Sequence, residues 1–169
     1  MDAYEAIITR RSIRAYTSQP IPPELIQQLL TAAMSAPSAG NQQPWQFIVV
    51  TERNMLDALA DVLPYGKMLR QAPLAIVVCG DQQLQTHAGY WVQDCSAATQ
   101  NLLLAAHASG LGAVWLGVYP REQRVADVRR LLGIPEHVVP LCVVSIGYPA
   151  EQKGPENRYR AEQVHYNRW

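Results

Sequence analysis

The segment from Trp91 to Ser109 constrains the fold more than any other part of the chain. It is mostly apolar, contains neither proline nor glycine, and runs directly into a Gly-Leu-Gly sequence at 110–112. This pattern predicts a helix that ends at a glycine. Because the segment is apolar nearly all round, we expect a central, buried helix. With 169 residues, 49% of them hydrophobic, the chain has enough apolar material to bury it in one compact domain.

Shorter patterns predict the other elements. Runs of β-branched and aromatic residues bounded by turn residues predict strands at 45–51, 74–79, 113–119 and 141–147. A short helix is predicted after Asp2, a second that starts at Pro22 and Pro23 and stops near Ser35, and others near 54–63 and at 121–132, ended by Gly133. The elements lack a regular βαβ rhythm, and no GxGxxG motif joins a strand to a helix, which argues against a Rossmann dinucleotide site.

Charge and cysteine content limit the class of partner. Lys+Arg and Asp+Glu both number 14, so no global field favours nucleic acid or an anionic membrane. Cys79, Cys95 and Cys142 lie far apart in apolar runs without metal-binding spacing, which indicates buried thiols in a reducing compartment. No apolar run approaches the roughly 18 residues of a membrane span, and the N-terminus has no signal-like apolar region. We therefore expect a cytoplasmic protein without a metal.

Two polar segments are candidates for ligand binding. Arg10, Arg11, Ser12 and Arg14 fall within five residues where a helix gives way to extended chain, so several donors can converge on one phosphate. The alternative is that Arg10 and Arg11 only favour the negative end of the helix dipole and stay solvated. Residues 36–45 are rich in small and amide side chains and offer backbone groups to a planar, amide-edged heterocycle, or else form an ordinary helix-to-strand loop.

Six motifs, in order along the chain, carry a resemblance to a known family. They are RRSIR at 10–14, PSAGNQQPWQF at 37–47, KMLRQAPLAIVV at 67–78, GLGAVWLG at 110–117, VVSIGYP at 143–149 and VHYNRW at 164–169. Together they resemble the nitroreductase family of FMN enzymes in one of its shorter forms. The resemblance implies an α+β fold with a central, mostly antiparallel sheet flanked by helices. It also implies a single domain over 1–169, an intertwined homodimer, and a C-terminal extension at about 150–169 that packs on the partner subunit.

The resemblance also assigns roles to individual residues. Arg10 and Ser12 are expected toward the FMN phosphate, and Arg14 toward the pyrimidine edge of the ring. Lys67 is expected near the flavin carbonyls, unless it is a plain surface lysine, and Arg158 at the phosphate. The full set of expected cofactor contacts is Arg10, Arg11, Ser12, Arg14, Pro37, Ser38, Ala39, Asn41, Gln43, Lys67, Trp115, Leu116, Gly117 and Arg158.

Some of these contacts are expected to come from a second subunit, and others involve positions where the chain differs from the family. Residues 37–39 are expected to reach the flavin from the other subunit, so a complete site requires the dimer. The 115–117 backbone is expected against the ring near N5, the alternative being simply a buried strand. The chain departs from the family pattern at Ala39, where many members have a serine, and at Pro64, where some have an asparagine, so contacts to the ribityl chain or phosphate and to the ring edge differ. The polar residues of the apolar helix are interpreted as partners in core hydrogen bonds; they are Asp94, Gln100 and Asn101.

The implied function is transfer of electrons from NAD(P)H through FMN to a small acceptor such as a nitroaromatic, a quinone or free flavin, with ping-pong kinetics. No catalytic side chain is expected, because the flavin performs the chemistry. The four histidines have neither triad nor metal spacing. The alternatives are a flavin-binding redox sensor or store without turnover, a specialised enzyme of the same fold such as a reductive dehalogenase, and a cofactor-free α+β dimer. The sequence indicates neither the physiological acceptor nor a preference for NADH or NADPH.

Overall fold

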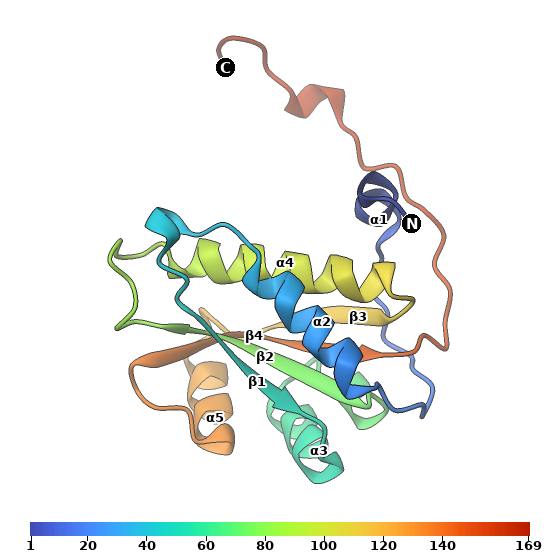
Figure 1. Ribbon diagram of the computed structural model, residues 1–169, viewed down its shortest axis with the longest axis vertical. Helices are drawn as coiled ribbons and strands as arrows, with labels where there is room; N and C mark the ends of the chain where they lie inside the picture. Colours follow the sequence, from blue (N-terminus) through green and yellow to red (C-terminus); the bar gives the residue numbers. More distant parts are fainter.

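The computed structural model describes residues 1–169 and is built on one four-stranded sheet (Figure 1). The strands lie in the order β1-β2-β4-β3, and every neighbouring pair is antiparallel. The elements in chain order are α1 (Ala3–Thr9), α2 (Pro23–Met34), η1 (Ala39–Asn41), β1 (Trp45–Val50), α3 (Arg53–Val62), η2 (Lys67–Arg70), β2 (Leu74–Asp81), α4 (Trp91–Ala108), β3 (Gly112–Gly117), α5 (Glu122–Leu132), β4 (Val138–Gly147) and η3 (Ala161–Gln163). The expected α+β class with a central antiparallel sheet is confirmed.

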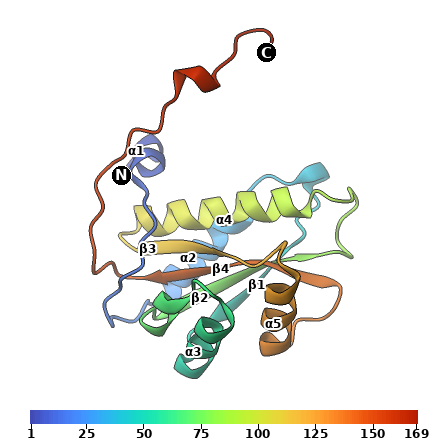
Figure 2. The same cartoon turned by 180° about the vertical axis from the view of Figure 1, so that it is seen from behind.

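Helices cover both faces of the sheet. Helices α2 and α4 lie on one face, and α3 and α5 lie on the other (Figures 1 and 2). Side chains of a strand alternate between faces, so Ile76 of β2 joins the core beneath α2 and α4 while Val77 joins the core against α3 and α5. This double coverage explains why β2 and β4 are apolar almost throughout instead of alternating with polar residues.

Local signals set the ends of several helices as expected. The Asp2 side chain accepts a hydrogen bond from Glu5 N at 2.8 Å and caps α1. Pro23 occupies the first position of α2, where a missing N–H costs nothing. Gly133 adopts a left-handed conformation with φ 64° and ends α5.

Helix α4 crosses the sheet centrally, as predicted, and buries one side completely. Cys95 and Leu102 have no exposed surface and belong to the larger core. Gln93 and Gln100, on other sides of the helix, are exposed in the single chain. The expected burial therefore holds for the sheet side of α4 and not for its outer side, and the interpretation of Gln100 as a partner in core hydrogen bonds is wrong. None of the helices combines the length and the apolar character that a membrane-spanning segment needs.

The N-terminal segment that follows α1 extends the sheet beyond β3. Ser12 forms a parallel bridge with Ala113, and Ile13 N donates to Ala113 O at 3.0 Å. The Tyr16 hydroxyl donates to Ile13 O and to Ser145 O, which ties the segment to β4. Arg10 and Arg11 are thus fixed beside the start of β3.

The C-terminal extension leaves the sheet after β4, passes α1 and then runs away from the body of the chain (Figures 1 and 2). Its aromatic residues find little packing within the chain, since Tyr159 is 70% exposed, Tyr166 80% and Trp169 100%. The extension is therefore an arm whose aromatic side chains are left exposed by the rest of the chain.

Leu102→Ala should lower the free energy of unfolding by about 2–5 kcal/mol, because it leaves a cavity in the core between α4 and the sheet. Gln123→Ala, at an exposed position of α5 on the other face of the sheet, should change it by less than about 0.5 kcal/mol. Urea unfolding of both variants at one protein concentration measures the difference. Equal effects would contradict the assigned burial of Leu102.

Candidate functional site

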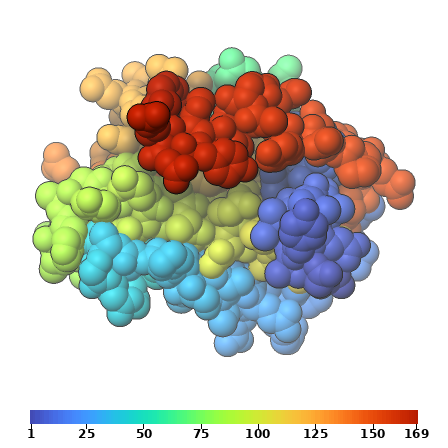
Figure 3. All heavy atoms as spheres, turned by 90° about the horizontal axis from the view of Figure 1, so that it is seen from above, coloured from blue at the N-terminus to red at the C-terminus, as the bar shows by residue number.

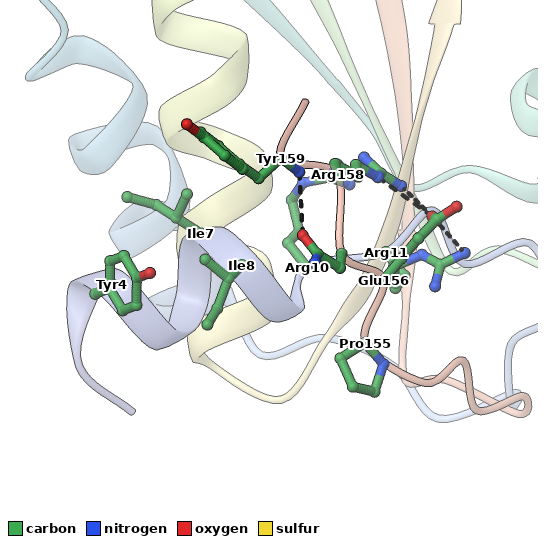
Figure 4. Close-up of a pocket in the computed structure, with 10 residues that line it drawn as sticks. Tyr4, Ile7, Ile8, Arg10, Arg11, Pro155, Glu156, Arg158 and Tyr159 are labelled. Carbon is green, nitrogen blue, oxygen red and sulfur yellow. Dashed lines mark hydrogen bonds and ion pairs between the residues drawn. The ribbon is translucent and has the colours of Figure 1, made fainter. Parts of the chain in front are cut away.

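The largest cavity described, about 540 Å³, lies between α1 and the C-terminal extension (Figure 4). Tyr4, Ile7 and Ile8 of α1 form an apolar side, and charged residues gather on the other. The lining residues are Tyr4, Ile7, Ile8, Arg10, Arg11, Pro155, Glu156, Asn157, Arg158 and Tyr159. The cavity thus brings together Arg10, Arg11 and Arg158, which the sequence placed at opposite ends of the chain.

The charged side of this cavity has an excess of cations. Glu156 forms ion pairs with Arg11 at 3.3 Å and with Arg158 at 2.9 Å, and these guanidiniums hold the pKa of Glu156 below its usual value. The guanidinium of Arg10 has no hydrogen bond or ion pair within the chain. Partial burial, then the nearby charges of Arg158 and Arg11, lowers the pKa of Arg10. Three guanidiniums facing one carboxylate suit a ligand with about two negative charges, such as a phosphate monoester.

A backbone path leads from this cavity along β3. Ser12 meets Ala113 at one end of the strand, and Gly117 lies four residues further on. At ~3.3 Å per residue the path is ~13 Å long. Trp115 is half-buried and Leu116 is buried, whereas Gly117 is exposed. A Cβ placed on Gly117 would meet no atom within 4 Å, so open space borders the backbone there.

Two residues that the sequence did not single out lie beside Gly117. Arg124 donates to Gly117 O at 3.0 Å, and its guanidinium carbon is 5.8 Å from the centroid of the Tyr65 ring. Tyr65 is 74% exposed and follows Pro64, one of the two departures from the family pattern. Lys67 follows two residues later, exposed at the start of η2. The only sequence signal for Tyr65 is an aromatic side chain between two turn residues, and Arg124 carried none.

Hydrogen bonds hold the 37–43 loop in a defined conformation. Ala39 N and Gln42 Nε2 both donate to the carboxylate of Asp94, at 2.9 and 2.6 Å. Gln43 N donates to Ser38 Oγ at 3.0 Å, and Gln43 Nε2 donates to Asn41 Oδ1 at 2.7 Å. Pro37 is exposed at the start of the loop. The expectation that Asp94 is buried and hydrogen-bonded is confirmed, and its partners are loop groups.

This loop lies far from Arg10 in the same chain. The loop is attached to Asp94, near the start of α4, whereas Thr9 Oγ1 lies 2.8 Å from His107 Nε2, near the end of α4. Thirteen residues of helix separate Asp94 from His107, which amounts to ~20 Å at 1.5 Å per residue. Within one chain, therefore, the loop and the arginine cavity cannot line the same phosphate.

The remaining expected residues lie along the junction of the N-terminal segment and the C-terminal extension. Arg14 is exposed, and its backbone N donates to Glu151 Oε1, which lowers the pKa of Glu151. Lys153 Nζ donates to Ser12 O at 2.6 Å. The extension is thus fastened to the 11–14 segment before it turns away.

The three cysteines take no part in this site. All are free and buried, as predicted. Burial raises the pKa of Cys79 and of Cys142 to about 12, so neither is a thiolate at neutral pH.

The structure is an α+β fold with a cavity rich in guanidinium groups, and comparisons with known proteins identify its family. A model of the nitroreductase family matches residues 7–67 and 60–148. A protein of Methanothermobacter thermautotrophicus with the provisional name NADH dehydrogenase/NAD(P)H nitroreductase is 54% identical over 169 residues, covering 100% of this chain and 88% of that protein. The chain therefore belongs to the nitroreductase family, a family of oxidoreductases.

Solved structures agree with this assignment. A crystal structure from Parabacteroides distasonis with the same provisional name has a TM-score of 0.94 at 47% identity, and the match covers 98% of both chains. A crystal structure from Desulfovibrio desulfuricans, provisionally named a nitroreductase and in complex with FMN, has a TM-score of 0.86 at 32% identity. That match covers 100% of this chain and 99% of the other. The resemblance inferred from the six motifs is confirmed.

Proposed function

We propose that the protein is an FMN-dependent oxidoreductase that carries electrons from NAD(P)H to a small acceptor, with a site completed by a homodimer. One observation carries the proposal. The partly buried guanidinium of Arg10 lacks a partner in a cavity where only Glu156 balances Arg11 and Arg158. The named relatives, which include a nitroreductase in complex with FMN, support FMN as the ligand that meets this charge.

The residues present fit FMN at both ends of the ~13 Å path along β3. At one end Arg10, Arg11, Ser12 and Arg158 would hold the phosphate, whose charge of about −2 matches the excess of cations. At the other end the open backbone face at Gly117 leaves room for a flat ring. A side chain at that position would fill part of this space.

When bound, FMN supplies the redox chemistry of the reaction. The side chains of this chain bind and orient, and none acts as a nucleophile. Arg14 and Lys67, both exposed, would place positive charge at the pyrimidine edge and stabilise the negative charge of the reduced cofactor. Reductant and acceptor would use the same open face in turn, which gives ping-pong kinetics. A nitroaromatic, a quinone or free flavin is the class of acceptor we propose.

Exposed apolar side chains support the homodimer. Tyr4, Ile7 and Ile8 of α1 are 73%, 57% and 49% exposed, and Met34 of α2 is 51% exposed. Figure 3 shows a strip of α4 uncovered between α1, α2 and the C-terminal extension. Contiguous exposed apolar surface of this kind marks an interaction site. We propose that a second copy covers it, receives residues 150–169 of the first, and brings its own 37–43 loop to the arginine cavity.

The zero net charge and the buried free thiols support a cytoplasmic protein without a nucleic-acid or membrane partner.

The visible spectrum of the purified protein tests the proposal directly. The protein should be yellow, or become so with added FMN, and should bleach within seconds of anaerobic mixing with NADH or NADPH. Re-oxidation by a nitroaromatic or a quinone then identifies turnover. Yellow protein that neither nicotinamide bleaches would favour a flavin-binding sensor or store, and protein that takes up no FMN would refute the proposal.

Arg10→Ala should weaken FMN binding by about 10- to 150-fold, because the phosphate would lose a charge-assisted hydrogen bond worth about 1.5–3 kcal/mol. Arg130→Ala is the matched control, since Arg130 lies on α5 and pairs only with Asp127. Flavin fluorescence titration measures both affinities. An unchanged affinity in Arg10→Ala would exclude Arg10 from the phosphate site.

Replacing both Tyr166 and Trp169 by alanine should raise the dimer dissociation constant by at least about 100-fold, because each buried aromatic contributes about 1.5–3 kcal/mol. Both side chains are at least 80% exposed in the single chain, so the substitutions should not change the stability of a monomer. Analytical ultracentrifugation measures the constant. Val49→Ala, an exposed apolar residue of edge strand β1, is the control, and equal dissociation constants in all three proteins would argue against an arm on the partner.

A further inference from the structure

The carboxylate of Asp94 is buried, and both of its oxygens are engaged by the 37–43 loop. Asp94 is only 4% exposed. Its Oδ1 accepts from Ala39 N at 2.9 Å and its Oδ2 from Gln42 Nε2 at 2.6 Å. The amide oxygen of Gln42 in turn accepts from His87 N at 2.9 Å. A chain of hydrogen bonds thus runs from the first turn of α4 through the loop to the segment that precedes α4.

The loop that these bonds hold has an uncommon backbone. Gly40, Asn41 and Gln43 all have positive φ, of 55°, 56° and 47°. For residues with a side chain this conformation is unfavourable and persists only where the surroundings enforce it. Gly40 also lies directly against the ring of His87, where a Cβ would come within 2.4 Å of Cε1. Asp94, from the buried side, and His87, which is itself exposed, therefore both restrict the loop conformation.

The outer side of the same loop is free. Asn41 and Gln43 are exposed, and their side chains hydrogen-bond to each other. Ser38 is half-buried, and its hydroxyl oxygen accepts from Gln43 N. The inner contacts thus fix the direction in which these outer polar groups point.

We propose that Asp94 is a positioning residue for the flavin site of the partner subunit. Its charge holds the 37–43 loop in the left-handed conformation that presents Ser38, Asn41 and Gln43 across the dimer. Asp94 itself touches neither cofactor nor substrate. This inference rests on the proposed function, because it takes FMN as the ligand and the homodimer as the assembly.

An ionised carboxylate is required because it only accepts hydrogen bonds. Both groups that face Asp94 are N–H donors. The near-isosteric change Asp94→Asn places an NH₂ donor against one of these donors, so one contact is lost without a change in side-chain volume. The loop then loses the restraint that keeps Asn41 and Gln43 at positive φ.

Asp94→Asn should weaken FMN binding by about tenfold or more in a fluorescence titration, as a buried donor is left without an acceptor. Gln42→Ala removes the hydrogen bond to Asp94 Oδ2 by a change in the loop instead of in α4, and it should also weaken FMN binding. Asp127→Asn, on α5, is the matched control and should bind as wild type does. The rate of hydrogen exchange over residues 37–43 of the flavin-free protein should rise in both Asp94→Asn and Gln42→Ala. Wild-type affinity for FMN in both of these variants overturns the proposal.

A hybrid dimer separates action on the partner's site from action within one chain. One chain carries Arg10→Ala, the other carries Asp94→Asn, and differently tagged copies are purified as the mixed dimer. If Asp94 acts across the interface, one site has both defects and the other has none, so the hybrid retains one tight FMN site per dimer. If it acts within its own chain, each site has one defect and no tight site remains, which overturns the proposal.

The failure of the proposed function has a different signature in the same experiment. Wild-type protein that binds no FMN would overturn the proposed function and this inference with it. Wild-type protein that binds FMN tightly, together with a hybrid that has no tight site, would overturn the role of Asp94 across the interface alone.

Discussion

Helix α4 packs against the sheet and positions both polar parts of the candidate site. Cys95 and Leu102 on its inner side have no exposed surface, so a shift of the helix relative to the strands would disrupt close packing. Its first turn holds the 37–43 loop through Asp94, and its last turn holds α1 through His107. The two polar parts of the candidate site are therefore kept ~20 Å apart in each chain by the length of helix between them. A site that uses both parts needs two chains.

The excess of positive charge in the cavity beside α1 is the second feature on which the proposed function depends. The C-terminal extension forms one side of the arginine cavity and is fastened to the 11–14 segment by Glu151 at Arg14 N and by Lys153 at Ser12 O. Glu156 then pairs with Arg11 and Arg158 and leaves the Arg10 guanidinium without an acceptor. Like charges held this close disfavour the folded state in the absence of an anion. An anionic ligand would remove that cost, so cofactor binding and folding are expected to support each other.

The pattern of the sequence predicted most of the fold and part of the site. Helix starts at Asp2 and Pro23 and the stop at Gly133 follow from contacts within a few residues, and the strand positions follow from short apolar runs. The RRSIR motif located the arginine cavity for the same reason, since its donors are neighbours in the chain. Tyr65 and Arg124 were missed because their meeting at Gly117 joins three distant segments, and nothing local marks it.

The class of the protein, its secondary structure and the residue types available to hold a phosphorylated cofactor follow from the sequence alone, because periodicity, capping and short motifs are properties of neighbouring residues. Which of these residues meet depends on the tertiary structure. In the folded chain Arg158 lies beside Arg10, and the 37–43 loop is hydrogen-bonded to Asp94 at the opposite end of α4. Such pairings depend on how helices and strands pack over long separations in the chain, which local sequence patterns do not specify.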